Sequence, residues 1–256
     1  MSKAYSAKFI IINLALLIAA SAKLGAEEIG FEITADFNSK YIWRGQNLRD
    51  DPVFQPAISA GYEGLTVSTW GNVDLTGING NGGDFSELDY SLDYSAKMGW
   101  LECAAYSVGV IYYDFPGTEL PDTTEVYWGL SLDVPISPSI TVYHDVDEAE
   151  GSYVSLGFAH SIEKIGELGS VLPVALEIDA SLGWGSGSYN KYYWGIEQSK
   201  LNDLVFSVSF PLEVSGWMVK PSLSYVTLLS DAIRDTDAYG TDSDFFVAGI
   251  GLLKSF

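Results

Sequence analysis

The feature of this sequence that most restricts its fold is a strict alternation of apolar and polar residues. Residues 65–75 place Leu65, Val67, Thr69, Gly71, Val73 and Leu75 on one parity and Thr66, Ser68, Trp70, Asn72 and Asp74 on the other. Because successive side chains of a β-strand point to opposite faces, this pattern predicts a strand with one apolar and one polar face. Residues 54–62 alternate in the same way, and only Glu63 and Gly64 separate the two segments. The two segments are therefore predicted to form a hairpin.

One such hairpin fits a half-buried soluble sheet as well as a membrane-spanning barrel, so the repetition of the pattern decides between them. Twelve segments are predicted as strands: 30–44, 54–62, 65–75, 85–98, 101–114, 124–134, 139–145, 153–163, 174–184, 204–212, 217–228 and 245–256. Most of them are close to the ten or so residues that a tilted membrane strand needs, and their number is even. The repetition favours the barrel.

The connections between these segments alternate in length. Short turns are expected around Glu63, Gly99, Ile136 and Ser215, and mostly longer connections at 46–52, 76–84, 115–123, 146–151, 186–202 and 229–243. The connection 164–173 departs from the alternation because it is long where a short turn is expected. Short turns at one end and long loops at the other are typical of an all-β, transmembrane, antiparallel up-and-down β-barrel of about 12 strands. Tyr and Trp residues gather near both ends of the segments, as interfacial girdles do, although both residues also favour strands in general.

The N-terminal residues have the pattern of a secretory signal peptide. Lys3 and Lys8 precede the apolar run 9–20, and small residues then follow up to Ala22 and Ala26. The apolar run is shorter than the roughly 20 residues of a spanning helix, so we expect cleavage after Ala22 or Ala26 rather than a membrane anchor.

The chain is strongly acidic once this segment is set aside. The full sequence has 13 basic and 34 acidic residues, and residues 1–26 contain three of the lysines and no acid. The remaining single domain, residues 27–256, therefore has 10 basic and 34 acidic residues and a formal charge of −24. A chain of this charge is not expected to bind nucleic acid unaided. Cys103 is the single cysteine of the sequence and cannot form an internal disulfide.

Several segments resemble a known family of outer-membrane proteins. The resemblance is strongest in SKYIWRGQ at 39–46, in the Asp51-Pro52 and Gln55-Pro56-Ala57 that follow, and in STWGNVDL at 68–75. It continues more loosely through 87–95, 124–133, 151–161 and 202–212. The chain is similar here to the TorF family of Gram-negative outer-membrane porins. This resemblance implies a barrel with channel function, an undefined solute and no assigned catalytic residues.

The C-terminal segment 245–256 ends on Phe256. A terminal aromatic residue on an alternating strand resembles the C-terminal signal of bacterial outer-membrane proteins. We therefore expect this strand to be recognised by the barrel-assembly machinery, and we expect the protein in the bacterial outer membrane in contact with its lipid.

Residues suited to catalysis are few. His144 and His160 are the two histidines of the sequence, and Ser161 lies on the opposite face of a strand from His160. A serine hydrolase needs a Ser, a His and an orienting partner, so only a pairing across strands remains open. The acidic residues 145–150 lack the spacing of a calcium loop and are expected to form a solvated loop. We therefore predict no enzyme activity, no cofactor and no metal site.

If the apolar faces point to lipid, the polar faces line a lumen. The candidate pore-lining residues are Glu32, Asp36, Lys40, Arg44, Asp74, Glu87, Asp89, Asp93, Lys97, Glu125, Asp133, Glu177, Asp179 and Lys220. The excess of acids predicts a passive channel for small solutes that favours cations or polar neutral molecules. Arg44 is expected near the outer mouth, paired with Asp74.

Two alternatives remain open at this stage. The charges could pair across the lumen and close a barrel that is only structural. The acidic loops at 229–243 and 47–51 could instead make the functional contact, as in a surface-binding protein without a conducting pore.

Overall fold

The computed structural model describes residues 29–78, 82–169 and 172–256, so the predicted signal peptide lies outside the described residues. In this part of the chain, twelve antiparallel strands close into one barrel because β1 pairs with β15 and β12 pairs with β14. The barrel strands are β1 Gly30–Asn38, β4 Val53–Tyr62, β5 Leu65–Asp74, β6 Phe85–Met98, β7 Leu101–Asp114, β8 Thr123–Leu132, β9 Ser139–Asp145, β10 Ser152–Leu168, β11 Leu172–Gly185, β12 Lys200–Ser209, β14 Trp217–Leu228 and β15 Asp244–Ser255. A short strand, β13 Leu212–Val214, also pairs with β14. The predicted all-β, up-and-down barrel of 12 strands is confirmed.

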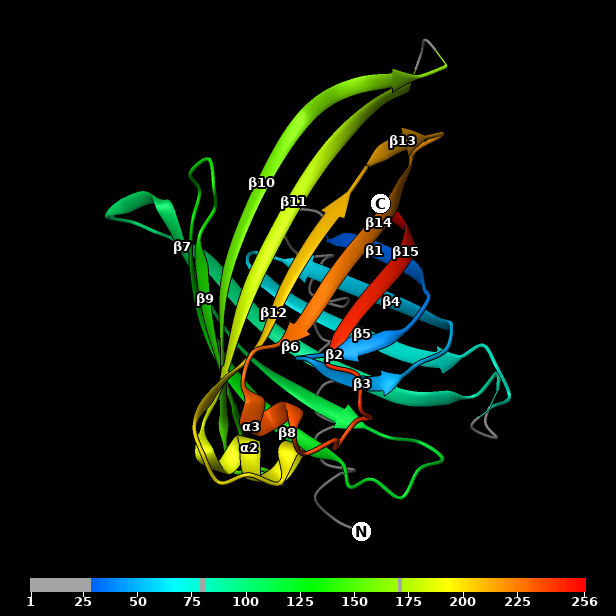
Figure 1. The fold of residues 1–256 in the computed structure, drawn as a ribbon. Coiled ribbons are helices and arrows are strands. Elements are labelled where there is room, and N and C mark those ends of the chain that lie inside the picture. Colours follow the sequence, from blue (N-terminus) through cyan, green and yellow to red (C-terminus); the bar gives the residue numbers. More distant parts are fainter. Residues whose placement is uncertain (1–28, 79–81, 170–171) are drawn as a thin grey trace.

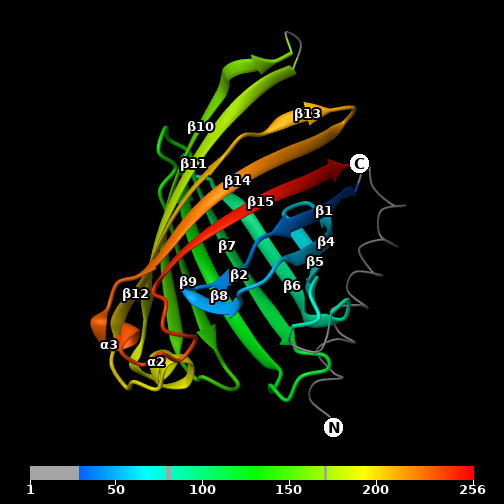
Figure 2. The ribbon, with the colours of Figure 1, turned by 45° about the vertical axis from the view of Figure 1, so that its right-hand side comes forward.

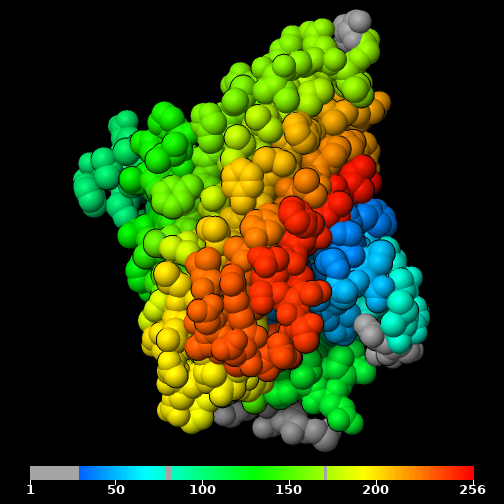
Figure 3. All heavy atoms as spheres, viewed as in Figure 1, coloured from blue at the N-terminus to red at the C-terminus, as the bar shows by residue number. Residues whose placement is uncertain are grey.

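The two faces of the barrel wall differ as the alternation predicts. Phe158, Phe206 and Leu223 lie on the outer face and are 49%, 47% and 47% exposed. Glu125 and Asn72 lie on the inner face and are almost completely buried. The residues that pair across neighbouring strands share one face of the wall, because strand pairing places opposed side chains on the same side. Figure 3 shows the outer face over β12, β14 and β15.

The long connection predicted at 164–173 is wrong. β10 continues to Leu168 and β11 begins at Leu172, so the two strands form a long hairpin that projects beyond the rest of the barrel (Figure 1). Their register shifts between Ile162 and Gly166. This irregularity breaks the alternation at that point and hides the continuation of the strand from a pattern of period two. The hairpin therefore no longer departs from the alternation, whereas the connections at 133–138 and 146–151 have equal lengths.

The first predicted strand, 30–44, is also wrong at its C-terminal end. β1 stops at Asn38, and the chain then forms a separate hairpin from β2 Tyr41–Trp43 and β3 Gln46–Arg49. Trp43 pairs with Gln46, so Arg44 and Gly45 form a two-residue turn with φ of 50° and 81°. Positive φ at both central residues is the requirement of a type I′ turn. We call residues 41–49 the inner hairpin, because it lies within the outline of the barrel in Figure 2.

Two short helices, α2 Gly187–Trp194 and α3 Asp231–Arg234, lie in the long connections at one end of the barrel (Figure 1). The Ser186 side chain caps the start of α2 by accepting a hydrogen bond from the Tyr189 amide, and Gly195 ends the helix with φ of 73°. Asn202 on β12 donates a hydrogen bond of 2.7 Å to the Asn190 side chain and so ties α2 to the barrel wall. No helix in the described ranges is long and apolar enough to cross a bilayer.

Candidate functional site

The inner hairpin inserts a single guanidinium into the barrel lumen. Arg44 Nη1 and Nη2 donate hydrogen bonds of 2.7 and 2.8 Å to the two carboxylate oxygens of Glu125 on β8. The side chains of Arg44 and Glu125 are only 9% and 1% exposed. Since the hairpin leaves the wall between β1 and β4, this pair connects two separate parts of the barrel wall through the lumen. A bidentate pair of this kind is among the strongest polar contacts in proteins.

Aromatic rings enclose the same guanidinium. Arg44 Cζ lies 4.4 Å from the ring centroids of Trp43 and Tyr143 and 4.5 Å from that of Tyr153. Tyr113 donates a hydrogen bond of 2.8 Å from its hydroxyl to Glu125 Oε2. The negative faces of aromatic rings attract a cation within about 6 Å of the centroid. The lumen therefore contains a cage of rings and carboxylate that already holds one organic cation, the side chain of Arg44.

The tip of the inner hairpin is in close contact with β12 and β14. A Cβ atom added to Gly45 would lie 2.7 Å from Leu228 Cδ2 and 2.9 Å from Asp203 Cβ, so only glycine fits there without displacement. Gln46 is buried and donates a hydrogen bond of 3.3 Å to the Tyr189 hydroxyl of α2. The hairpin is thus held by β8, β12, β14 and α2 together.

The predicted pair between Arg44 and Asp74 is wrong. Asp74 instead accepts a hydrogen bond of 2.7 Å from Arg49 Nε, at the other end of the inner hairpin. Lys40, expected on the first strand, lies between β1 and β2 and pairs with Asp50. The physical reason is that the chain leaves the wall after Asn38, so residues beyond it no longer follow the spacing of a strand.

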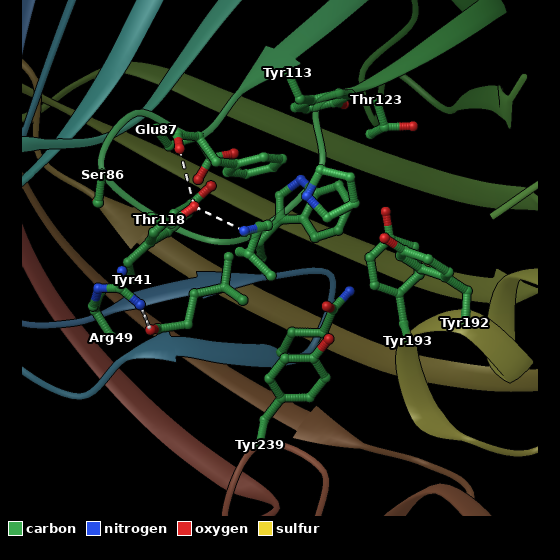
Figure 4. Close-up of a pocket in the computed structure, with 16 residues that line it drawn as sticks. Tyr41, Arg49, Ser86, Glu87, Tyr113, Thr118, Thr123, Tyr192, Tyr193 and Tyr239 are labelled. Atoms are coloured by element: carbon green, nitrogen blue, oxygen red, sulfur yellow. Dashed lines mark hydrogen bonds between the residues drawn. The ribbon is translucent and has the colours of Figure 1, made fainter. Parts of the chain in front are cut away.

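The inner hairpin separates two cavities. The first, which we call the mouth cavity, has a volume of about 320 Å³ and lies at the end of the long connections (Figure 4). Its lining includes Tyr41, Trp43, Arg49, Glu87, Tyr113, Tyr192, Tyr193 and Tyr239. Burial raises the pKa of the Tyr193 and Tyr239 hydroxyls, both in the long connections, so both stay neutral at physiological pH. Aromatic residues make up seven of the sixteen that line the mouth cavity.

The second cavity, which we call the lumen cavity, lies on the inner side of the hairpin and has a volume of about 350 Å³. It is lined by Trp43, Arg44, Asp89, Ile111, Tyr113, Tyr143, Tyr153, Ser155, Ser181, Asp203 and Val205. Trp43 and Tyr113 line both this cavity and the mouth cavity, and their rings meet edge to face at 6.0 Å. We call these two rings together with Arg44 the constriction, because both rings line both spaces.

Two further cavities share lining residues with the lumen cavity. One of about 250 Å³ lies against β1, β14 and β15 and shares Arg44 and Val205. The other, of about 240 Å³, shares Ser181 and Val205 and is lined by Asp179 together with serine and glycine residues. Small polar side chains therefore leave space along the inner wall below the constriction.

More acidic than basic side chains line these four cavities. The acids are Glu87, Asp89, Asp179 and Asp203, and the bases are Lys40, Arg44 and Arg49. Each of these bases is paired with a further carboxylate, on Asp50, Glu125 and Asp74 respectively. After this pairing, Glu87, Asp89, Asp179 and Asp203 remain, and each lining base named above already has a carboxylate partner.

The structure places the other predicted pore-lining residues in different ways. Lys220 pairs with Glu177 and lies near enough to Asp36 and Asp179 to interact with both electrostatically. Asp93 accepts a hydrogen bond of 2.6 Å from the Tyr127 hydroxyl. Glu32, Lys97 and Asp133 lie towards the short-turn end of the barrel.

Sequence reasoning missed the residues that surround Arg44. Five separate segments contribute these residues, which are Trp43, Tyr143, Tyr153, Tyr189 and Asp203, and nothing in their local pattern indicates that they meet. The one signal available was the Arg-Gly pair between two short alternating runs, which is compatible with a two-residue turn. Arginine is uncommon at such a position, because a non-glycine residue rarely adopts positive φ.

A serine and a histidine do meet across two strands. His144 Nδ1 lies 2.9 Å from Ser152 Oγ, and the two residues oppose each other on β9 and β10. Among the described residues, no carboxylate orients His144, so the arrangement lacks the third member of a catalytic triad. This pair lies on the outward parity of β9 and β10, away from the lumen.

The predicted solvated loop at 145–150 is partly wrong. Asp145 is fully buried, and its Oδ1 accepts hydrogen bonds from the backbone amides of Asp147, Glu148 and Ala149. It therefore stabilises a turn rather than facing solvent. A search of residues 29–78, 82–169 and 172–256 finds no group of three or more side chains placed to hold a metal ion.

A closed barrel with an apolar outer wall and a polar interior defines the class of up-and-down β-barrels that span outer membranes. Solved structures with this fold include the KdgM porin in complex with disordered oligogalacturonate, with a TM-score of 0.52 and 10% identity over 89% of this chain and 99% of that chain. The NanC porin has a TM-score of 0.50 and 11% identity over 87% and 98% of the two chains. LpxR from Salmonella typhimurium has a TM-score of 0.51 and 10% identity over 88% and 99%.

At sequence identities of 10% and 11%, the similarity to these structures shows the fold alone. Two of these three structures are named as porins and the third is not, so the fold alone does not separate a channel from another barrel function. No protein-family description and no curated protein matches the chain, and the resemblance to the TorF family stays a prediction.

Proposed function

We propose that this protein is an outer-membrane, porin-like channel for the passive passage of small solutes, with a preference for cations and polar neutral molecules. The observation that carries the proposal is the charge of the cavity walls. Four carboxyl groups line the four cavities, whereas the three bases that line them are each paired with another carboxylate. In a narrow space of low polarity, such charges attract cations and repel anions.

The proposal includes an orientation. The long connections, with α2, α3 and the mouth cavity, would face the outside of the cell, and the short turns would face the periplasm. Outer-membrane lipid would cover the apolar belt, and the strand ending at Phe256 would be recognised by the barrel-assembly machinery. The channel would have no catalytic role and would need no cofactor.

The proposal is tested by recording currents from the purified protein in planar bilayers. With unequal KCl concentrations on the two sides, the reversal potential should have the sign of a cation-preferring channel. Asp179→Asn should move this potential towards zero, because it removes a carboxylate from the wall of the cavity of about 240 Å³. The matched control is Asp242→Asn, an equal loss of charge at an exposed position in an outer loop.

Two outcomes contradict the proposal. Absence of conductance and of liposome swelling would leave a structural barrel, or one that binds partners through its acidic loops. An anion-preferring reversal potential would show that the lining carboxylates do not control permeation.

A further inference from the structure

One carboxylate oxygen in the lumen has no partner. Asp89 Oδ1 is buried, and no hydrogen bond reaches it from any described residue. Asp89 lines the lumen cavity together with Arg44 and Asp203. A buried acceptor without a donor is energetically unfavourable, and more so when it is charged. A cation that enters the cavity would relieve this cost.

The charges around the lumen cavity are not balanced by the chain itself. Arg44 is the single base that lines the cavity, and Glu125 occupies both of its terminal nitrogens. Asp89 and Asp203 remain, and Asp203 accepts a hydrogen bond of 2.9 Å from the neutral Tyr153 hydroxyl. The lining of the lumen cavity therefore includes two carboxyl groups besides the pair of Arg44 and Glu125.

The walls of the lumen cavity are suited to a planar organic cation rather than to a hydrated metal ion. Tyr113, Tyr143, Tyr153 and Trp43 present aromatic rings to it. Three of these rings already lie over a guanidinium, since Arg44 Cζ is 4.4 Å from the centroids of Trp43 and Tyr143 and 4.5 Å from that of Tyr153. A volume of about 350 Å³ is at the small end of the range for small-molecule sites.

We propose that the lumen cavity is a binding site for small organic monocations that carry a guanidinium group. The guanidinium would donate to Asp89 Oδ1 and to Asp203, and would stack on the tyrosine rings beside the guanidinium of Arg44. Such cations would be a substrate class of the proposed channel, so the biological role of this site rests on the proposed function. Its binding chemistry is nevertheless measurable without conduction.

The test is titration calorimetry of methylguanidinium into the purified barrel in detergent micelles. Methylurea is the matched control ligand, because it has nearly the same planar shape and no charge. The wild-type protein should bind methylguanidinium and not methylurea. Asp89→Asn should weaken the binding by about tenfold or more, since it removes the charge that meets the ligand and keeps the size of the side chain.

A second pair of variants separates the site from the general charge of the lumen. Asp203→Asn removes the other carboxylate of the cavity and should also weaken binding. Asp93→Asn removes one charge from the same strand as Asp89, at a residue that lies outside the cavity lining, and should have a smaller effect than either. Retained resistance to unfolding in SDS without heating shows that each variant has folded.

The outcomes distinguish this inference from the proposed function. Absence of methylguanidinium binding, equal binding of methylurea, or equal losses in Asp89→Asn and Asp93→Asn would overturn the site. If the protein binds methylguanidinium with these specificities but conducts no current, the binding site is supported and the proposed channel function is contradicted. If it conducts current but does not bind methylguanidinium, the channel function is supported and the binding site is contradicted.

Discussion

At the scale of single residues, Arg44 is the centre of the lumen. Its charge is paired with Glu125, its faces are covered by aromatic rings, and its backbone is held at a φ of 50°. Such a backbone conformation costs of the order of 1–3 kcal/mol for a residue other than glycine and persists only when the surrounding contacts enforce it. The contacts of Arg44 with Glu125 and with the rings hold the backbone in this conformation.

Arg44→Ala should lower the free energy of unfolding by roughly 3–5 kcal/mol, because it leaves Glu125 buried without a cation. The double variant Arg44→Ala/Glu125→Gln should recover part of this loss, since no uncompensated charge remains. The control is Lys40→Ala, whose partner Asp50 is largely exposed and whose loss should cost about 1 kcal/mol or less. Urea unfolding followed by tryptophan fluorescence measures all three, and equal costs for Arg44 and Lys40 would contradict the role given to the Arg44 pair.

At the scale of elements, the inner hairpin is an addition to a barrel that is complete without it. β1 and β4 pair along their full lengths, from Gly30 opposite Gly61 to Asn38 opposite Val53. The hairpin uses none of these backbone hydrogen bonds and pairs only with itself. It fills the lumen rather than building the wall, and the size of the pathway at this level therefore depends on it.

Replacing residues 41–49 by a short Gly-Ser linker should leave a folded barrel and raise the single-channel conductance, because it removes the constriction between the mouth cavity and the lumen cavity. Bilayer recordings of the purified variant measure the change. Shortening residues 116–121, which contribute to the mouth cavity and not to the lumen cavity, should have a smaller effect. An unchanged conductance after hairpin replacement would place the narrowest point elsewhere.

At the scale of the whole molecule, the barrel separates an apolar outer surface from a polar, acidic interior. Each strand contributes one parity to each side, so adjacent residues have opposite environments. Leu130 faces outward and is 40% exposed, whereas Ser131 faces the interior. The folded protein therefore requires an apolar surrounding on one side and tolerates charge on the other.

Arginine introduced on the two faces should have unequal costs. Leu130→Arg should lower the stability of the barrel in a bilayer by up to roughly 2–4 kcal/mol, with the amount depending on depth, because the charge must enter lipid. Ser131→Arg should cost much less, since its side chain points into the lumen. Equilibrium unfolding in lipid vesicles measures the difference, and equal costs would exclude a lipid-facing outer wall.

The sequence by itself determined the barrel. Period-two alternation and the alternating lengths of the connections are local properties, and together they predicted twelve strands, their approximate bounds and the direction of each face. The prediction failed at two places where the apolar–polar pattern does not report strand pairing. At the β10–β11 bulge the strands continue although the alternation is interrupted. After Asn38 the alternation continues although the chain has left the barrel wall.

The tertiary structure alone decided the site. Sequence reasoning selected Arg44, Glu125 and Asp89 as pore-lining candidates but paired Arg44 with Asp74, because strand spacing was the only measure of distance available to it. The actual partner lies 81 residues away on β8, and the rings around Arg44 come from three strands and a helix. Contacts across a lumen depend on which strands face each other after the barrel closes, and closure is a property of the whole set of strands rather than of any one segment.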